Sequence, residues 1–89
     1  MHHYVYILQS QQRERFYVGL TEDPATRLIQ HNKGFTQSTK PYRPWILIYT
    51  EKFEQKSDAT KREWHLKHPA GYLEKRAIIE QYKHSGGFA

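Results

Sequence analysis

The sequence predicts an α+β domain with a small, mostly antiparallel sheet of three strands, in the order β-β-α-β-α-α. Two β-branched and aromatic runs, 4–8 and 16–20, are separated by seven polar residues, which favours a hairpin over a parallel crossover. A third run, 45–49, stands between helical segments. With 89 residues and neither repeats nor linkers, we expect one domain over 1–84 and a loose tail at 85–89.

The first helix is predicted between Asp23 and Gly34. Aspartate commonly caps helix N-termini, and Pro24 fits the first helical position. Glycine is a usual residue just past a helix C-terminus, so Gly34 ends the helix. The expected inward positions are Ala25, Leu28 and Ile29.

The run at 45–49 is apolar on both alternating faces, which places it inside the sheet. A second helix is predicted from Ser57 or Asp58 to about His68, where 69–71 interrupts it. A third helix follows from Tyr72 to about Lys83, with the expected inward positions Leu73, Ile78, Ile79 and Tyr82.

The composition excludes several classes of protein. There is no cysteine, which rules out disulfide frameworks, cysteine-ligated zinc and thiol nucleophiles. No apolar run approaches the ~20 residues of a membrane span, and no signal-peptide core opens the chain, so a cytoplasmic location is expected. Aromatic residues make up 15% of the chain, far more than a disordered chain would have.

The positive charge is concentrated in the middle of the chain. The formal net charge is +5, and residues 31–50 carry Lys33, Lys40 and Arg43 without an acidic residue. Basic groups interleaved with aromatic ones suit a nucleic acid, whose phosphates and bases they can contact. A basic surface that serves solubility alone is the other interpretation.

Glu63 stands at an unusual place for a carboxylate. On a helix it shares a face with Ala59 and Leu66, which points it along the side that packs on the sheet. Burying an unpaired carboxylate costs several kcal/mol, so a partner is required. That partner is either a cation such as Lys67, Arg62 or another arginine, or a divalent metal ion, Mg²⁺ or Mn²⁺.

Arg27 and His31 are four residues apart and therefore share a helix face. A guanidinium grips phosphate in a bidentate manner, and an imidazole donates a hydrogen bond or accepts a proton. The pair suits a shared anionic ligand. The other interpretation is that Arg27 pairs with Asp23 and that His31 is solvated.

Tyr6 and Tyr17 are expected on one face of the hairpin. A symmetric hairpin turning at 10–13 places them opposite each other, where two phenols can orient a water and a phosphate oxygen. Ordinary packing is the alternative role. Gly19 lies on the same face, where a missing side chain lets something approach the sheet.

Together these residues resemble the GIY-YIG nuclease family, in particular its short, single-domain bacterial branch of predicted endonucleases with a URI-type domain. The resemblance covers roughly residues 3–68. It rests on Tyr4-Val5-Tyr6, Tyr17-Val18-Gly19, Thr21, Arg27, His31-Asn32-Lys33-Gly34 and Lys61-Arg62-Glu63. The chain departs from the family pattern in having Tyr4 for the first glycine, a helix break at 69–71, and no asparagine after Asn32.

The resemblance implies a three-stranded antiparallel sheet flanked by helices and metal-dependent hydrolysis of phosphodiester bonds in DNA, with a structure-directed role in repair or recombination. It implies that Glu63 binds the Mg²⁺ or Mn²⁺ ion and that Arg27 steadies the scissile phosphate. Tyr6 and Tyr17 match the two motif tyrosines, one of which helps to activate water, and His31 matches a supporting histidine.

DNA is thus the expected partner, with Lys33, Lys40 and Arg43 attracting its backbone. We expect no membrane partner and no small-molecule organic cofactor, and a monomer or weak homodimer. Two other functions stay open. One is a non-catalytic nucleic-acid-binding module, and the other is a homodimeric interaction domain that uses Trp45, Trp64 and the C-terminal helix.

Overall fold

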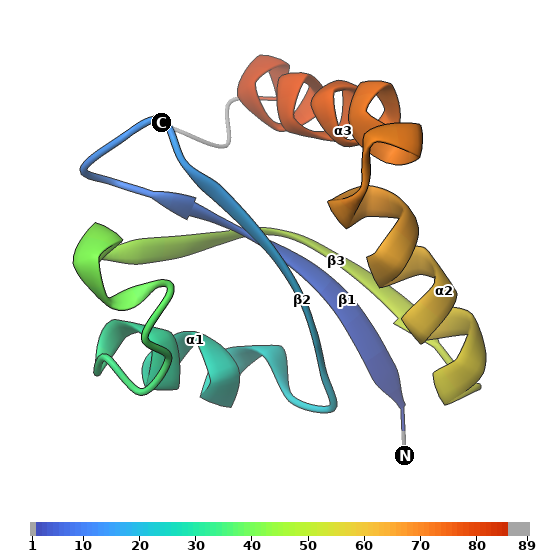
Figure 1. Ribbon diagram of the computed structural model, residues 1–89, viewed down its shortest axis with the longest axis horizontal. Coiled ribbons are helices and arrows are strands. Elements are labelled where there is room, and N and C mark those ends of the chain that lie inside the picture. The colour runs from blue at the N-terminus through green and yellow to red at the C-terminus, as the bar shows by residue number, and fades with distance from the viewer. Residues whose placement is uncertain (1, 86–89) are drawn as a thin grey trace.

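The computed structural model describes residues 2–85, and its elements follow the predicted order (Figure 1). A three-stranded antiparallel sheet has the strand order β2-β1-β3, and short 3₁₀ turns, η1 and η2, join the larger elements. The elements are β1 (His3–Ser10), β2 (Phe16–Thr21), α1 (Pro24–Asn32), η1 (Lys40–Tyr42), β3 (Trp45–Phe53), α2 (Lys56–Lys67), η2 (Pro69–Gly71) and α3 (Tyr72–His84). The predicted α+β class is confirmed.

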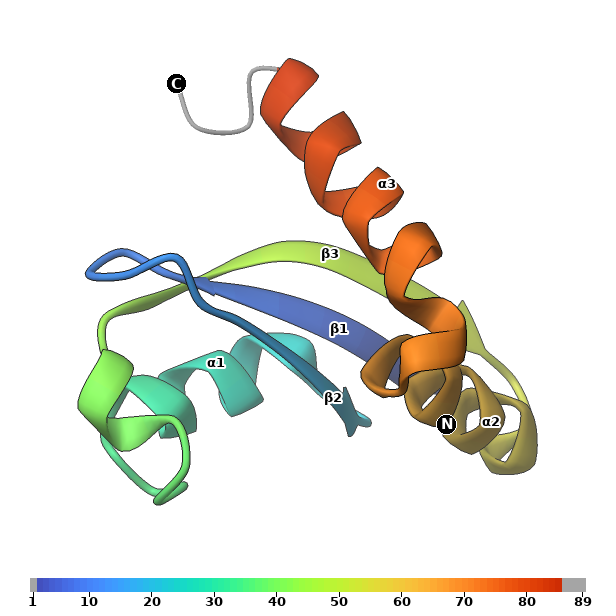
Figure 2. The same ribbon diagram turned by 45° about the horizontal axis from the view of Figure 1, so that its top comes forward.

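Both faces of the sheet are covered. In Figure 2 the sheet lies between α1 on one side and α3 on the other, with α2 beside its end. Because successive strand residues point to opposite faces, the buried run 5–8 of β1 serves two clusters. The α2–α3 face buries Val5, Ile7, Val18, Ile48, Ala59, Leu66 and Ile79. The α1 face buries Tyr6, Leu8 and Trp45, with Tyr17, Leu28, Tyr42 and Leu47 packed against them.

The placement of β3 inside the sheet is wrong, because β1 is the central strand and β3 is an edge. The run is apolar on both faces because both faces of this edge strand are covered. Trp45 packs with the α1-side cluster, whereas Ile48 belongs to the α2–α3 side. A strand with helices on both sides is apolar on both faces even at the edge of a sheet, so this pattern does not distinguish an edge strand from a central one.

The helix boundaries agree with the sequence prediction to within one or two residues. Asp23 caps α1, and its carboxylate accepts a hydrogen bond from the Thr26 amide at 3.2 Å. Gly34 follows the helix with a φ of 83°, a conformation that glycine adopts at low cost. Of the predicted tail, 86–89 lies outside the described residues.

The prediction of inward positions is partly wrong. Ala25, Ile29 and Leu73 are exposed, Leu73 to 80%. The residue that α1 buries is His31, and Leu28, three residues earlier on the same face, is half-buried. The expected inward positions of α3 that do pack on the core are Ile78, Ile79 and Tyr82. No helix within 2–85 is long and apolar enough to cross a membrane.

Candidate active site

Tyr6 and Tyr17 lie on the α1 face of the sheet, as expected, but in a different register. Tyr6 is opposite Gly19, and Tyr17 is opposite Leu8. The tyrosines are therefore diagonal neighbours, with ring centroids 6.3 Å apart. A shift of two residues keeps every side chain on its face, so the pair survives this correction.

The register follows from how the hairpin turn is closed. The Ser10 amide donates to the Arg15 carbonyl at 2.9 Å, which makes 11–14 the turn. The Ser10 hydroxyl accepts hydrogen bonds from the amides of Gln12 and Arg13, and donates to the Tyr42 carbonyl at 2.7 Å. This contact with a distant loop shifts the turn away from the symmetric position.

Gly19 makes room for Tyr6. A Cβ atom at position 19 would overlap the phenol ring of Tyr6. The expectation that something approaches the sheet at this glycine is confirmed, and the group that approaches is this ring, which is only 1% exposed.

His31 is fully buried beside the tyrosines, so the solvated alternative is wrong. Its Nε2 is 2.8 Å from the Tyr6 hydroxyl, and its Nδ1 is 2.8 Å from the Thr39 hydroxyl. The Thr39 hydroxyl donates its own hydrogen to the Thr36 carbonyl at 3.2 Å, so it accepts from Nδ1–H. In the neutral ring, Nε2 is then the free acceptor and takes the hydrogen of the Tyr6 hydroxyl.

Burial sets the protonation states of this pair. Burial lowers the pKa of His31 to about 4, and the positive charge of Arg27 adds to the effect, so the imidazole is neutral at pH 7. Burial also raises the pKa of Tyr6 to about 12, helped by Tyr17 and by the negative charge of Glu63, and opposed by Arg27. Tyr6 is consequently a neutral phenol that points its hydrogen at His31.

Arg27 is held beside this pair by its own helix and the following loop. Its guanidinium donates to Gln30 Oε1 and to Thr36 Oγ1, both at 3.0 Å, and does not pair with the Asp23 carboxylate, which caps the helix. Because the same loop carries Thr36 and Thr39, it orients Arg27 and His31 together. The guanidinium is half-buried and its charge is felt at both Tyr6 and His31.

Glu63 approaches the tyrosines from α2, whose buried face carries Ala59 and Leu66 as expected. The Glu63 side chain is 22% exposed, and its Oε2 is 3.1 Å from Lys67 Nζ. The same ammonium lies 5.5 Å from the centre of the Tyr17 ring, so Lys67 links the carboxylate to the tyrosines. Of the two cationic partners proposed on the same helix, Lys67 is the one that Glu63 has, since Arg62 pairs with Glu51 and Glu74.

The donor set fits a magnesium-type ion rather than a metal held by protein alone. Within residues 2–85 no group of three or more His, Asp or Glu side chains could hold a metal ion. Mg²⁺ is commonly bound through one or two carboxylates, with water and substrate phosphate completing its shell. The partly exposed carboxylate of Glu63, whose charge reaches Tyr6, meets that requirement.

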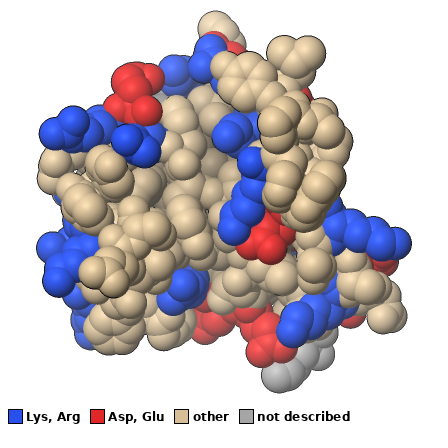
Figure 3. Space-filling model, in the orientation of Figure 1, with Lys and Arg blue, Asp and Glu red and all other residues tan. Residues whose placement is uncertain are grey.

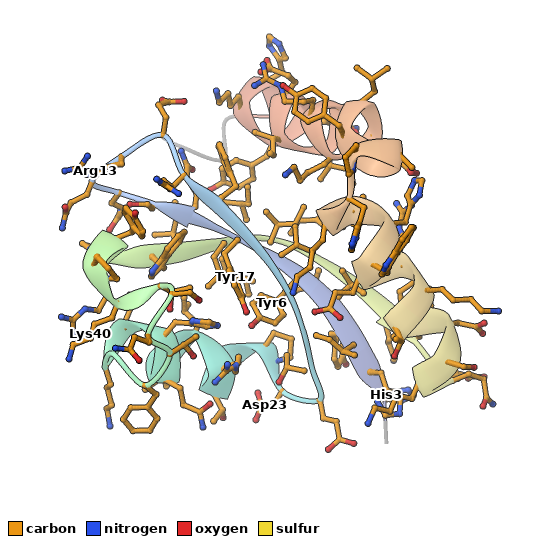
Figure 4. All side chains as sticks on the ribbon, viewed as in Figure 1. His3, Tyr6, Arg13, Tyr17, Asp23 and Lys40 are labelled. Atoms are coloured by element: carbon orange, nitrogen blue, oxygen red, sulfur yellow. The ribbon has the colours of Figure 1, made fainter. Side chains whose placement is uncertain are left out.

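The basic residues Lys33, Lys40 and Arg43 lie on the loop beyond α1. Lys33 and Lys40 are exposed, and the Arg43 Nε donates to the Lys40 carbonyl at 2.8 Å. Figure 4 shows Lys40 at the outer edge, whereas Tyr6 and Tyr17 lie near the centre between the sheet and α1. Figure 3 shows the molecule in the same orientation as Figure 4, with a central surface of uncharged residues bordered by Lys and Arg side chains and by a few acidic ones.

Sequence reasoning missed Thr39 and the position of Lys67. Thr39 is 1% exposed, and its carbonyl also accepts the indole hydrogen of Trp45 at 2.9 Å. It stands in a loop rich in serine and threonine, where nothing local distinguishes it. Lys67 is four residues after Glu63, so the i,i+4 spacing did indicate that ion pair but not its contact with Tyr17.

Comparisons with known proteins agree with this arrangement. The family model described as the GIY-YIG catalytic domain matches residues 2–76, so the protein belongs to the GIY-YIG family, whose domain indicates nuclease activity. Among its relatives are proteins named UPF0213. One from Enterococcus faecalis is 48% identical over 65 residues, covering 68% of this chain and 72% of the relative. One from Staphylococcus saprophyticus is 41% identical, covering 73% and 79%.

A solved structure gives the same result. The solution NMR structure of a UPF0213 protein from Bacillus halodurans superposes with a TM-score of 0.55 at 30% identity, covering 89% of this chain and 84% of that one. The resemblance read from the tyrosine motifs is thereby confirmed, and so is the fold that it implied.

Proposed function

We propose that this protein is a divalent-metal-dependent endonuclease that hydrolyses phosphodiester bonds in DNA, with Tyr6, Tyr17, Arg27, His31 and Glu63 as its catalytic residues. The observation that carries the proposal is the gathering of these side chains from β1, β2, α1 and α2. Two aromatic hydroxyls, a neutral imidazole, a guanidinium and a carboxylate are the groups that phosphodiester hydrolysis needs: proton acceptors, a phosphate clamp and a metal ligand.

Arg27 would hold the scissile phosphate. Its guanidinium is fixed by two side-chain hydrogen bonds, which leaves donors free for non-bridging oxygens. A positioned guanidinium stabilises the charge that develops on these oxygens in the transition state. Because Gln30 and Thr36 orient the group beforehand, little reorganisation is needed when the phosphate binds.

Tyr6 and His31 would together remove a proton from the attacking water. With a pKa of about 12, Tyr6 is a poor base by itself at neutral pH. Its oxygen can accept the water proton while its own hydrogen passes to Nε2 of His31 over 2.8 Å. The product is hydroxide, a neutral phenol and an imidazolium. Because burial and the charge of Arg27 lower the pKa of His31 to about 4, His31 would hold this proton only when the negative charge of the bound phosphate raises that pKa. Tyr17, whose ring centre is 5.0 Å from that of His31, would help to position the water.

Glu63 would be the protein ligand of Mg²⁺ or Mn²⁺. When bound there, such an ion supplies Lewis-acid stabilisation of the leaving 3′ oxygen. Lys67 occupies one oxygen of the carboxylate at 3.1 Å, so its ammonium must move aside or share the carboxylate. Lys33, Lys40 and Arg43 would contact backbone phosphates away from the bond that is cut. Three such contacts predict a slope of log K against log salt near −3.

The test is nicking of supercoiled plasmid with Mg²⁺ or Mn²⁺, and with EDTA as the metal-free arm. Glu63→Gln and Arg27→Ala should each lower the rate at least about 100-fold, as loss of a positioned electrostatic group does. Glu54→Gln and Arg13→Ala are matched controls, because both residues are exposed and Arg13 lies at the hairpin turn (Figure 4). Unchanged, metal-stimulated nicking by Glu63→Gln would refute the proposal.

One observation favours a second candidate, a nucleic-acid-binding module without catalysis. The Lys67 ammonium already neutralises Glu63, so the carboxylate has a partner without any metal. This alternative predicts salt-sensitive DNA binding that is the same with and without EDTA and in Glu63→Gln, together with no nicking by the wild type.

A further inference from the structure

Three aromatic side chains gather where α2 meets α3. A pocket of about 410 Å³ is lined by Lys67, His68, Pro69, Tyr72 and Lys75. Trp64 stacks on His68, with ring centroids 4.1 Å apart and planes inclined by 17°. Trp64 and Tyr72 are 56% and 52% exposed, which is high for such large aromatic residues. We call these five lining residues and Trp64 the aromatic pocket.

The aromatic pocket is basic. Two lysines and a histidine line it, and no acidic side chain does. Glu74, on the first turn of α3, is engaged elsewhere, accepting hydrogen bonds from Arg62 at 2.7 Å and from His65 at 2.8 Å. Lys67 is paired with Glu63, so among the lining residues Lys75 carries the positive charge that no ion pair within residues 2–85 balances. Aromatic faces beside such a charge suit a nucleobase and its phosphate.

Lys67 joins the aromatic pocket to the candidate active site. On a helix of 3.6 residues per turn, Lys67 lies about 40° from Glu63 and about 60° from Trp64, between the two. Its ammonium contacts Glu63 at 3.1 Å and lies 5.5 Å from the Tyr17 ring centre, while its side chain lines the pocket. A strand whose phosphate lies at Arg27 and Glu63 would thus carry a neighbouring nucleotide to the pocket.

We propose that the aromatic pocket binds an unpaired nucleobase of the substrate strand, next to the phosphodiester bond that is cut. The proposal rests on the nuclease function proposed above and deepens it by naming the substrate class. Aromatic side chains stack on bases only where the base face is free, as in single strands, flaps and branch points. The pocket therefore selects DNA with unpaired nucleotides at the cutting site over continuous duplex.

The experiment measures binding without cleavage, in EDTA. Fluorescence anisotropy of dye-labelled probes compares a 12-nucleotide oligothymidylate, an abasic strand of the same length and a blunt 12-base-pair duplex. The variants are Trp64→Ala, Trp64→Phe and Tyr72→Ala. Leu73→Ala is the matched control, since Leu73 is 80% exposed beside Tyr72 and does not line the pocket. Thermal melting of each variant verifies that it is folded.

Trp64→Ala and Tyr72→Ala should each weaken binding of the oligothymidylate by about 5- to 150-fold, the effect of losing one stacked base. Trp64→Phe should recover part of this loss. Binding of the abasic strand and the duplex should stay within about twofold, and Leu73→Ala should resemble the wild type. Oligothymidylate should also quench the fluorescence of the exposed Trp64, whereas the fluorescence of Trp45, which is only 3% exposed, should not change.

The proposal would be overturned if the Trp64 and Tyr72 variants lost the same affinity for all three probes or lost none. It would also be overturned if the wild type bound no DNA. A dimer in sedimentation that Trp64→Ala dissociates, with DNA binding unchanged, would assign the pocket to a second copy of the chain instead. Base-dependent binding without nicking by the wild type would support the aromatic pocket while refuting the nuclease. If the protein nicks flapped and continuous DNA equally and Trp64→Ala does not change the rate, the nuclease function is supported and the role of the aromatic pocket is refuted.

Discussion

Replacing Thr39 by valine tests whether this hydroxyl sets the tautomer of His31. Valine has nearly the same shape, so the change removes the hydrogen bonds and leaves no cavity. The Thr39 hydroxyl accepts from His31 Nδ1 at 2.8 Å and donates to the Thr36 carbonyl at 3.2 Å. Without it, one nitrogen of a fully buried imidazole loses its partner whichever tautomer forms.

The cost to stability follows from that orphaned nitrogen. An unsatisfied buried polar group costs ~1–3 kcal/mol, whereas the Thr36 carbonyl keeps the amides of Thr39 and Lys40 as donors. For a domain of this size, each kcal/mol moves the melting temperature by about 4–8 °C. We therefore expect Thr39→Val to melt roughly 5–20 °C below the wild type.

The cost to activity is separate, because it depends on which nitrogen carries the hydrogen. With no acceptor at position 39, the hydrogen is better placed on Nε2, where it bonds to the Tyr6 oxygen and prevents proton transfer from the phenol. General-base catalysis is worth about 10²–10⁴ in rate, so Thr39→Val should lose activity in that range at temperatures where it is folded.

Nitrogen NMR of the His31 ring is the decisive assay, since it distinguishes Nδ1–H from Nε2–H without any turnover. Thr39→Ser keeps a hydroxyl and should retain both the wild-type tautomer and most of the activity. If Thr39→Val is folded, keeps the hydrogen on Nδ1 and cleaves within about threefold of the wild type, the role given to Thr39 is refuted.

Three further outcomes are expected. Gly19→Ala places a methyl group against the buried Tyr6 ring, and such overpacking should destabilise the fold by ~1–3 kcal/mol; an unchanged melting curve would contradict it. Folding lowers the pKa of His31 from 6.5 to about 4, so between these two pH values the unfolded chain binds a proton that the folded chain does not. The free energy of unfolding therefore falls as the pH drops from 6.5 to 4, by at most about 3 kcal/mol. Urea unfolding of the wild type and of His31→Gln at pH 7 and pH 4.5 measures this loss. If the free energy of unfolding falls by the same amount in both proteins between these pH values, His31 is not the cause. Lys67→Met frees Glu63, so half-maximal nicking should need up to about fivefold less Mg²⁺; a higher requirement would show that the ammonium does not compete.

The parts of the fold that could be predicted are those with local signals. The cap at Asp23 and the glycine at 34 mark α1 by the backbone groups that they satisfy and the conformation they allow. The hairpin register could not be predicted, because the Ser10 hydroxyl closes the turn against the carbonyl of Tyr42, which is 32 residues away. The edge position of β3 likewise depends on which strands pair after folding.

The candidate site also combines features that local sequence signals predict with features that depend on distant contacts. Its five residues could be chosen from their spacing and from the motif that they resemble, and the charges of Arg27 and Glu63 both reach Tyr6 in the structure. Their protonation could not be read from the sequence, because it depends on burial and on Thr39, a loop residue whose hydroxyl meets His31 only in the folded chain. Exposed Ile29 shows the limit of apolar patterning, since α1 buries a histidine in preference to an isoleucine.

The alternation within β1 explains how so small a domain tolerates this polar cluster. Val5 and Ile7 point to the α2–α3 face, where the fully buried members of the cluster are apolar and each large side chain contributes ~1.5–3 kcal/mol. Tyr6, between them, points to the α1 face and places its hydroxyl against His31. Alternate residues of β1 therefore serve different purposes: those on the α2–α3 face stabilise the fold, and Tyr6 on the α1 face belongs to the candidate site. The polar network adds specificity to a fold that the apolar face already stabilises. Because a shift of one residue in the pairing of β1 would exchange the two faces, the same alternation that builds the site also fixes the register that it needs.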